Sequence, residues 1–140
     1  MKALTIWRPW TWAICHPSVK AKRVENRIWA APAWMKHQQL AIHAGLSYDG
    51  DADRMILNIL NERPPADCPT GIVAVAVVRG CISGDPTTIA DPWYCGPIGW
   101  LLDDVRVLPS PVPCKGAKGL WPLPDDVEDL VLMQLGEFAP

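Results

Sequence analysis

Hydrophobic and polar positions along this chain form short blocks, most of which end at prolines, glycines or acidic residues. Blocks in which apolar and polar residues alternate, or in which β-branched residues dominate, are typical of strands. On this basis we predict strands at residues 2–7, 22–29, 39–44, 71–82, 99–108 and, more briefly, 119–121. In 99–108 the alternation changes phase at Asp103 and Asp104, which predicts a β-bulge at that point.

Three further segments have the spacing of helices. Pro9 is suited to the first turn of a short helix that ends at about His16, because its fixed φ fits that position. Residues 49–62 place apolar side chains three and four apart, and 125–135 begins with an acidic turn that the helix dipole favours. Five or six short strands with two or three packed helices predict an α+β fold, built as a small β-barrel. We expect one domain over residues 1–140, since no linker interrupts the chain.

Composition narrows the class of protein. No apolar run approaches the ~20 residues that cross a bilayer, and the first residues lack the apolar stretch of a signal peptide. The five cysteines are widely spaced and form no C-x-x-C pair, which disfavours a disulfide framework or a zinc site. We therefore expect a cytoplasmic protein without a membrane segment, in which the cysteines are small buried hydrophobic residues.

Charge is distributed unevenly behind the net value of −2. Residues 1–40 carry seven Lys or Arg against one acid, a net of +6, whereas residues 41–140 have a net of −8. A basic field of this size attracts phosphates, and the acidic remainder limits indiscriminate binding of polyanions. The alternative is that the two halves only neutralise each other across the fold.

The segment 5–13 reads "TIWRPWTWA" and concentrates aromatic side chains around one arginine. Trp10 and Trp12 lie two residues apart in the predicted helix, so their rings point to roughly opposite sides. We expect Trp12 in the core and Trp10 as a wall of a cleft, and Trp7 fits either role. Arg8, at the junction of strand and helix, can reach an anion or a base edge; a surface ion pair is the alternative.

The segment 22–29 reads "KRVENRIW" and brings a carboxylate between cations. On a strand, Glu25 and Arg27 share a face, while Lys22 lies at the entrance to it. A carboxylate in this setting suits an ion pair, or an acceptor for the amino group of a base. A surface ladder of ion pairs is the alternative interpretation.

A third cluster contains tryptophans and lysines later in the chain. Trp93 and Trp100 flank a Gly-Pro turn that could rim a cavity, and Lys115 and Lys118 add positive charge to a glycine-containing turn. Packed structural turns are the simpler alternative. His43 alternates with apolar residues, which indicates a hydrogen-bonded structural histidine, and no nucleotide-loop, zinc-protease or nucleophile-elbow motif is present.

Taken together, these segments resemble the ASCH domain family, a branch of the PUA-like superfamily. The stretch "ALTIWRPWTWAI" is similar to the family's opening "lSIrqPWA..I", and "KRVENRIW" is similar to "GK.vEnRsW". The segments "LAIHAG", "GIVAVAVV", "GPIGWLLDDVRVLP" and "PVPCKGAKGLWPLP" continue the resemblance in the expected order over almost the whole chain. The resemblance implies a small β-barrel with helices packed around it, in agreement with the pattern above.

The resemblance also implies a ligand: RNA, DNA or a modified nucleoside, held near the Pro-Trp helix and the K..E.R segment. The positions of this sequence that match are Arg8, Pro9, Trp10, Lys22, Glu25, Asn26 and Arg27. One bacterial branch hydrolyses N4-acetylcytidine with a lysine and a threonine three residues later, assisted by a glutamate. Lys22 matches that lysine, but Glu25 stands where the threonine would be and cannot supply a hydroxyl nucleophile.

Three functions follow as hypotheses. The first is a module that binds RNA, single-stranded nucleic acid or a modified nucleobase, with Trp10 or Trp93 as a stacking face. The second is a small hydrolase of an N4-acylcytidine-like amide or of RNA, with Glu25 as general base and Lys22 or Arg27 as electrostatic stabiliser. The third is a protein-interaction module anchored by the segment 93–100. None of the three requires a cofactor or a metal, and the sequence does not predict an oligomeric state.

Overall fold

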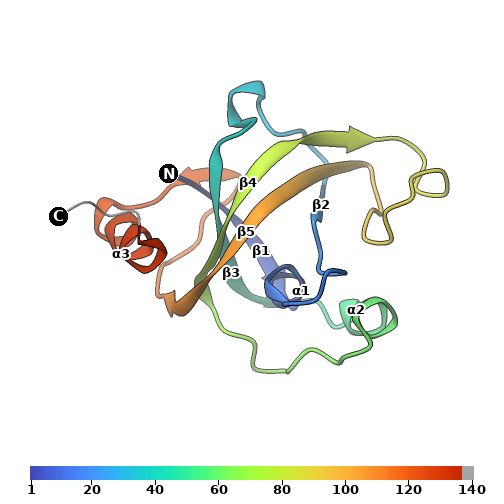
Figure 1. Ribbon diagram of the computed structural model, residues 1–140, viewed down its shortest axis with the longest axis horizontal. Helices are drawn as coiled ribbons and strands as arrows, with labels where there is room; N and C mark the ends of the chain where they lie inside the picture. Colours follow the sequence, from blue (N-terminus) through green and yellow to red (C-terminus); the bar gives the residue numbers. More distant parts are fainter. Residues whose placement is uncertain (137–140) are drawn as a thin grey trace.

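One curled sheet of six strands forms the framework of the protein, shown in Figure 1 as a computed structural model that describes residues 1–136. The strands are β1 (Lys2–Arg8), β2 (Val24–Arg27), β3 (Gln39–Tyr48), β4 (Gly71–Ser83), β5 (Ile98–Val112) and β6 (Leu120–Pro122). They lie in the order β2-β5-β4-β3-β1-β6, with β1 and β3 parallel and all other neighbours antiparallel. The helices are α1 (Trp10–Cys15), α2 (Ala52–Leu60) and α3 (Asp125–Leu135), with a 3-10 turn, η1 (Ala33–Met35). The sheet curls into a half-barrel, which confirms the expected small α+β barrel-like fold.

Strand β5 extends further than the sequence pattern predicts. The pattern predicts a strand at 99–108, and Pro109 and Pro111, which cannot donate to a ladder, follow it. In the structure the ladder to β4 steps from Val107, opposite Ala74, to Val112, opposite Ile72. The two prolines lie in the irregular stretch between these pairs, where no N–H is required, so the strand resumes beyond them.

The same strand carries the predicted bulge. Val75 and Val77 of β4 pair with Arg106 and Asp103, so β5 has one more residue than β4 between these pairs. Asp104 adopts a φ of +44°, in the left-handed region that aspartate enters more readily than most residues. A bulge increases the local twist of a sheet, and this one therefore contributes to the curl of the half-barrel.

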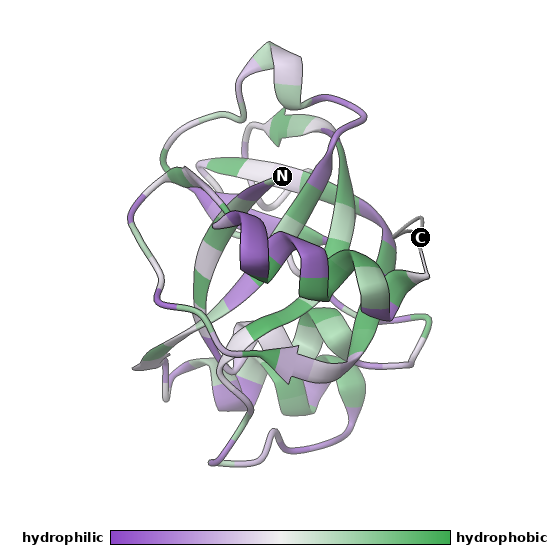
Figure 2. Cartoon of the chain, turned by 90° about the vertical axis from the view of Figure 1, so that its left-hand side faces the viewer, coloured by the Kyte–Doolittle hydropathy of each residue, from purple (hydrophilic) through white to green (hydrophobic). Residues whose placement is uncertain are grey.

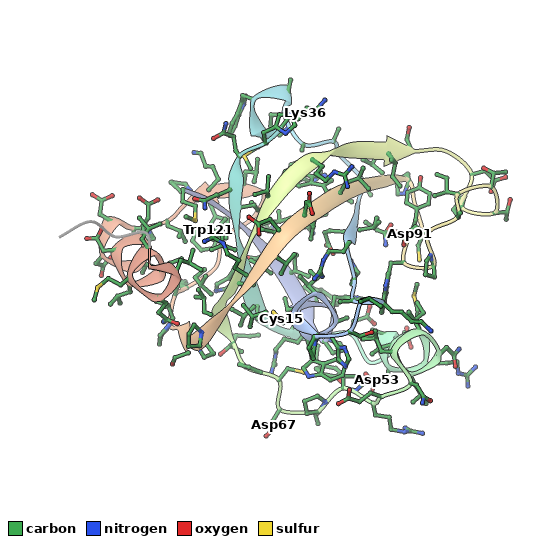
Figure 3. All side chains as sticks on the ribbon, viewed as in Figure 1. Cys15, Lys36, Asp53, Asp67, Asp91 and Trp121 are labelled. Atoms are coloured by element: carbon green, nitrogen blue, oxygen red, sulfur yellow. The ribbon has the colours of Figure 1, made fainter. Side chains whose placement is uncertain are left out.

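The sheet separates two hydrophobic layers, because successive residues of a strand point to opposite faces. In β1, Leu4 and Ile6 face an inner layer that includes Trp100 and is covered by α1. Ala3 faces an outer layer that includes Trp121, whose position beside α3 is labelled in Figure 3. Figure 2 looks onto α3 and shows that the hydrophilic residues of this helix gather in its first half.

The five cysteines are free thiols in different environments. Cys68 is buried, and burial raises the pKa of the Cys15 thiol to about 12, so both behave as the small hydrophobic residues that we expected. Cys81 and Cys95 are exposed, and the expectation of burial is wrong for these two. Cys81 lies near the end of β4, where burial alternates along the strand, and Cys95 lies in the connection that precedes β5.

Gly99 of β5 tests how closely the edge of the half-barrel is packed. A Cβ at this position would lie 2.6 Å from Val24 Cγ1 and 2.9 Å from Tyr94 Cδ1. We expect Gly99→Ala to lower the free energy of unfolding by about 1–3 kcal/mol through overpacking, measured by urea denaturation. Gly50→Ala is the matched control, because a Cβ there meets nothing within 4 Å. Equal effects of the two substitutions would show that the packing between β2 and β5 can relax to accept the added methyl group.

Candidate functional site

Three charged side chains lie in a row beside β2, which is the edge strand at one end of the sheet. Lys22 Nζ lies 2.9 Å from Glu25 Oε1, and Arg27 Nε lies 3.7 Å from Glu25 Oε2. Lys22 is 2 % exposed and Glu25 is 6 % exposed. The structure therefore brings together the three charged residues that the sequence placed in one segment, and it buries two of them instead of leaving a surface ladder.

Backbone contacts fix the segment that carries these three side chains. The N–H of Lys22 donates to the carbonyl of Ala13, the last turn of α1, at 3.0 Å, so the lysine is anchored before β2 begins. Its ammonium group donates to Val24 O as well as to the carboxylate of Glu25. Glu25 itself lies in β2 opposite Trp100 of β5. The ion pair is thus held between a helix and two strands.

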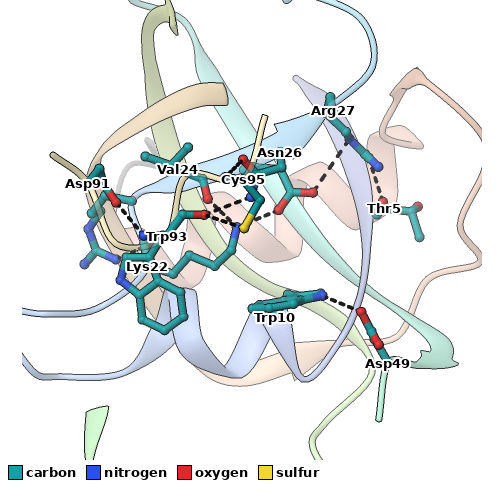
Figure 4. Close-up of polar contacts among 12 residues, drawn as sticks. Thr5, Trp10, Lys22, Val24, Asn26, Arg27, Asp49, Asp91, Trp93 and Cys95 are labelled. Atoms are coloured by element: carbon teal, nitrogen blue, oxygen red, sulfur yellow. Dashed lines mark hydrogen bonds and ion pairs between the residues drawn. The ribbon is translucent and has the colours of Figure 1, made fainter. Parts of the chain in front are cut away.

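Arg27 connects β2 to the opposite side of the half-barrel. Its Nη2 donates to the carbonyl of Thr5 in β1 at 2.9 Å, a contact drawn in Figure 4. The pairing of β1 with β6 reaches only to Leu4, so the carbonyl of Thr5 lies beyond the ladder. Arg27 therefore links the two sides of the open sheet through a side chain where strand pairing is missing.

A pocket of about 220 Å³ opens beside these charged side chains and is lined by Trp10, Lys22, Glu25, Asn26 and Cys95. We call it the Trp10 pocket. The indole of Trp10 donates to Asp49 Oδ2 at 3.1 Å. Lys22 Nζ lies 5.6 Å from the centroid of the Trp10 ring, close enough for a cation–π interaction. Trp10 is therefore held as one wall of the pocket, and its bond to Asp49 is drawn in Figure 4.

The pocket offers both a donor and an acceptor. Lys22 has three N–H bonds, of which two are directed at Val24 O and Glu25; the third has no acceptor among residues 1–136. Glu25 faces a cation on each of its oxygens and keeps lone pairs for a further donor. With two cations and one carboxylate, the group has a net charge of +1, which favours a ligand with acceptor atoms or negative charge.

Asn26 shapes the pocket and has little capacity left for a ligand. Its Nδ2 donates to the carbonyl of Trp93 at 2.9 Å, and its Oδ1 accepts from the N–H of Cys95 at 2.9 Å. These bonds tie β2 to the connection between β4 and β5. The position of Cys95 at the pocket rim follows from them.

Four residues of the predicted site do not line the Trp10 pocket: Arg27, which contacts Glu25 from outside it, and Arg8, Pro9 and Trp93. The guanidinium of Arg8 donates to the carbonyls of Gly45, Leu46 and Cys68 at 2.7–3.0 Å, so it holds β1 against β3 and the loop before β4. Pro9 is buried as the N-cap residue of α1. Trp93 is 2 % exposed and packs edge-on against Trp10 with ring centroids 6.5 Å apart. Because its ring is covered, Trp93 supports Trp10 from behind and offers no face to a base.

Trp12 was expected in the core and His43 in a structural role, whereas Trp100 was expected beside a turn that could rim a cavity; for Trp100 the packed alternative holds. Trp100 is fully buried, and Trp12 is partly buried against the ring of His16. His43 is buried and hydrogen-bonded through both ring nitrogens, to Thr5 Oγ1 at 3.1 Å and to the carbonyl of Cys114 at 2.7 Å. The structural role predicted for His43 is confirmed.

Two residues of the site were not found from the sequence. Asp49, which orients Trp10, lies 39 positions away from it, and its only local signal is the turn-forming run "YDGD". Cys95 was grouped with the other cysteines as a core residue. Its contact with Asn26 spans 69 positions, and no local periodicity could reveal it.

Comparison of the sequence with models of known protein families finds no match, and comparison with curated protein sequences also finds none. Within residues 1–136, no group of three or more His, Cys, Asp or Glu side chains could hold a metal ion. No helix in the same part of the chain is long and apolar enough to cross a membrane. The geometry of the Trp10 pocket is therefore the main indication of function.

A double-mutant cycle tests whether Lys22 and Glu25 act as one unit. We expect Glu25→Gln to lower the free energy of unfolding by about 3–5 kcal/mol, because it leaves a buried ammonium without its carboxylate. Lys22→Met should cost less, since Arg27 still faces Glu25. The double variant should be more stable than the sum of the two losses by about 1–3 kcal/mol, measured by urea denaturation.

The control cycle uses Arg79→Met and Asp103→Asn. This ion pair has a distance of 3.9 Å, and its side chains are 63 % and 60 % exposed. An exposed pair of this kind should couple much more weakly. Additive losses for Lys22 and Glu25 would contradict the view that they form one buried unit.

Proposed function

We propose that this chain binds a single nucleobase in the Trp10 pocket, either as part of a nucleic acid or as a modified nucleoside. The observation that supports this most strongly is the convergence of an aromatic wall, an ammonium donor and a carboxylate acceptor on one pocket of about 220 Å³. A flat, polar ring satisfies all three groups at once. Stacking on an aromatic side chain contributes about 1–3 kcal/mol per base.

The donor and acceptor favour a base with an amino group next to a ring acceptor. In cytosine the exocyclic amine can donate to Glu25, while the neighbouring ring nitrogen accepts from the third N–H of Lys22. In uracil a carbonyl replaces the amine and would face the carboxylate without a proton between them. Because Lys22 and Glu25 are buried, such mismatches are poorly screened by water.

The proposed function agrees with the resemblance to the ASCH domain family, and we propose that the chain is a domain of that type. The free thiols suit a reducing compartment such as the cytosol. An interaction module anchored by the segment 93–100 is less well supported, because Trp93 and Trp100 are both buried. A hydrolase with a hydroxyl nucleophile is also less well supported, because none of the five residues that line the pocket carries a hydroxyl group. A hydrolase with Glu25 as general base is the second candidate, because Glu25 lines the pocket.

Nucleoside titration tests the proposal directly. We expect cytidine and N4-acetylcytidine to bind more tightly than uridine in isothermal titration calorimetry. Trp10→Leu should weaken binding by about 1–3 kcal/mol through loss of stacking. Trp34→Leu is the matched control, since Trp34 is exposed on η1 and does not line the pocket.

Two outcomes would contradict this prediction. Equal affinity for cytidine and uridine would exclude the Lys22–Glu25 edge as the reader of the base. Release of cytidine and acetate from N4-acetylcytidine, lost in Glu25→Gln, would show that the pocket hydrolyses the amide by activating water, and would favour the hydrolase.

Alkylation of Cys95 gives a second, independent test of occupancy. Cys95 and Cys81 are both exposed, but only Cys95 lines the Trp10 pocket. We expect a saturating nucleoside to slow the reaction of Cys95 with iodoacetamide at pH 8 severalfold, followed by mass spectrometry of peptides. Cys81 serves as the internal control and should react at an unchanged rate. Equal protection of both thiols, or of neither, would place the ligand elsewhere.

A further inference from the structure

A second and larger hollow, of about 740 Å³, lies between the ends of β1 and β3 and the loop at residues 113–118. Thr5, His43 and Leu46 line it from the sheet, and Lys115 and Lys118 line it from the loop. We call it the loop hollow. None of the residues that line it is acidic.

The floor of the loop hollow is a fixed polar relay. Trp121 Nε1 donates to Thr5 Oγ1 at 3.2 Å, and Thr5 Oγ1 lies 3.1 Å from His43 Nδ1. A carbonyl can only accept, so His43 Nε2 carries a proton toward Cys114 O, and Nδ1 accepts from the Thr5 hydroxyl. A Cβ at Gly116 would lie 2.7 Å from both His43 Cε1 and Thr5 Oγ1. The loop backbone therefore lies directly on this relay, where a side chain would not fit.

The loop presents donors that lack acceptors. Lys115 and Lys118 are exposed and pair with no acidic side chain among residues 1–136. Over the same part of the chain, the backbone N–H groups of residues 115–118 find no hydrogen-bond acceptor. A hollow rich in N–H donors and cations, with no carboxylate in its lining, suits an anion such as a phosphodiester.

Arg27 connects the loop hollow to the Trp10 pocket. Its Nε faces Glu25, a wall of the Trp10 pocket, and its Nη2 contacts Thr5, a wall of the loop hollow. The Nε is buried and makes no hydrogen bond among the described residues. On β1, the alternation of side chains puts Trp7 on the same face as Thr5, and the ring of Trp7 is 56 % exposed. An exposed aromatic ring thus lies two positions along β1 from Thr5, a wall of the loop hollow.

We infer that the ligand of this protein is a single strand of nucleic acid, which continues from the base in the Trp10 pocket into the loop hollow. A phosphodiester of the strand binds at Lys115 and Lys118, and a neighbouring base stacks on Trp7. This inference rests on the proposed function and extends it, because it assigns the chain a polynucleotide instead of a free nucleoside.

The test compares cytidine with a single-stranded octamer of cytidylate. Both are titrated calorimetrically, and the octamer is also followed by fluorescence anisotropy between about 0.05 and 0.2 M KCl. We expect the octamer to bind more tightly than cytidine. Lys115→Ala/Lys118→Ala should weaken the octamer roughly 5-fold at about 0.1 M salt and lower the slope of log K against log salt by about 0.7, since the one phosphodiester bound there contributes about 0.7 on a single strand. Affinity for cytidine should be unchanged.

Matched variants separate this site from a general effect of charge or of lost aromatic surface. Lys36→Ala/Arg79→Ala removes two exposed cations from another hollow, between η1 and β4, and should have little effect; Lys36 is labelled in Figure 3. Trp7→Ala should weaken the octamer roughly 5- to 150-fold, whereas Trp34→Ala should not.

Two results would overturn the inference in distinguishable ways. If cytidine binds but the octamer binds no more tightly, or if the two lysine pairs have equal effects, the strand does not enter the loop hollow and the single-base pocket remains. If neither cytidine nor the octamer binds, both the proposed function and this extension fail.

Discussion

The buried contact between Glu25 and its two cations is the constraint on which the site depends. Removing charges from water is costly, and the cost is offset only when each charge keeps close partners. Here Lys22 is held by the carbonyl of Val24 and by Glu25, and Arg27 reaches across to the carbonyl of Thr5. Because the last contact lies beyond the ladder of β1 with β6, the ion pairs beside the pocket also link the two sides of the half-barrel.

This double role gives the pocket its rigidity. Trp10 is held by Asp49 through its indole N–H, by Trp93 behind it and by the ammonium of Lys22 over its ring. A ligand entering such a pocket does not have to order the groups that contact it, so little affinity is lost to side-chain entropy. The loop hollow is preorganised in a similar way, since His43 is hydrogen-bonded on both sides and the backbone at Gly116 packs directly against it.

Local patterns predicted the elements well and the site only in part. Alternation and apolar runs located all six strands, and the phase change at Asp103 and Asp104 located the bulge, because both depend on neighbours along the chain. The grouping of Lys22, Glu25 and Arg27 was also local, and the structure keeps it. The long-range contacts were not predictable. Whether a tryptophan such as Trp93 is covered, or where an arginine finds its acceptors, is decided by partners more than 35 positions away.

The distribution of charge along the sequence also does not show which cations are exposed and which are used inside the fold. Four of the seven cations among residues 1–40 donate to backbone carbonyls: Arg8, Lys22, Arg23 and Arg27. Their charge acts at short range, inside the fold, so the first forty residues do not form the broad basic surface that a count of charges predicts. Lys115 and Lys118 belong to the acidic remainder of the chain, yet both are exposed beside a hollow and pair with no acid among residues 1–136. An anionic ligand responds to the exposure and pairing of individual cations, and in this respect the Trp10 pocket, with its buried and paired lysine, differs from the loop hollow, with its two exposed lysines.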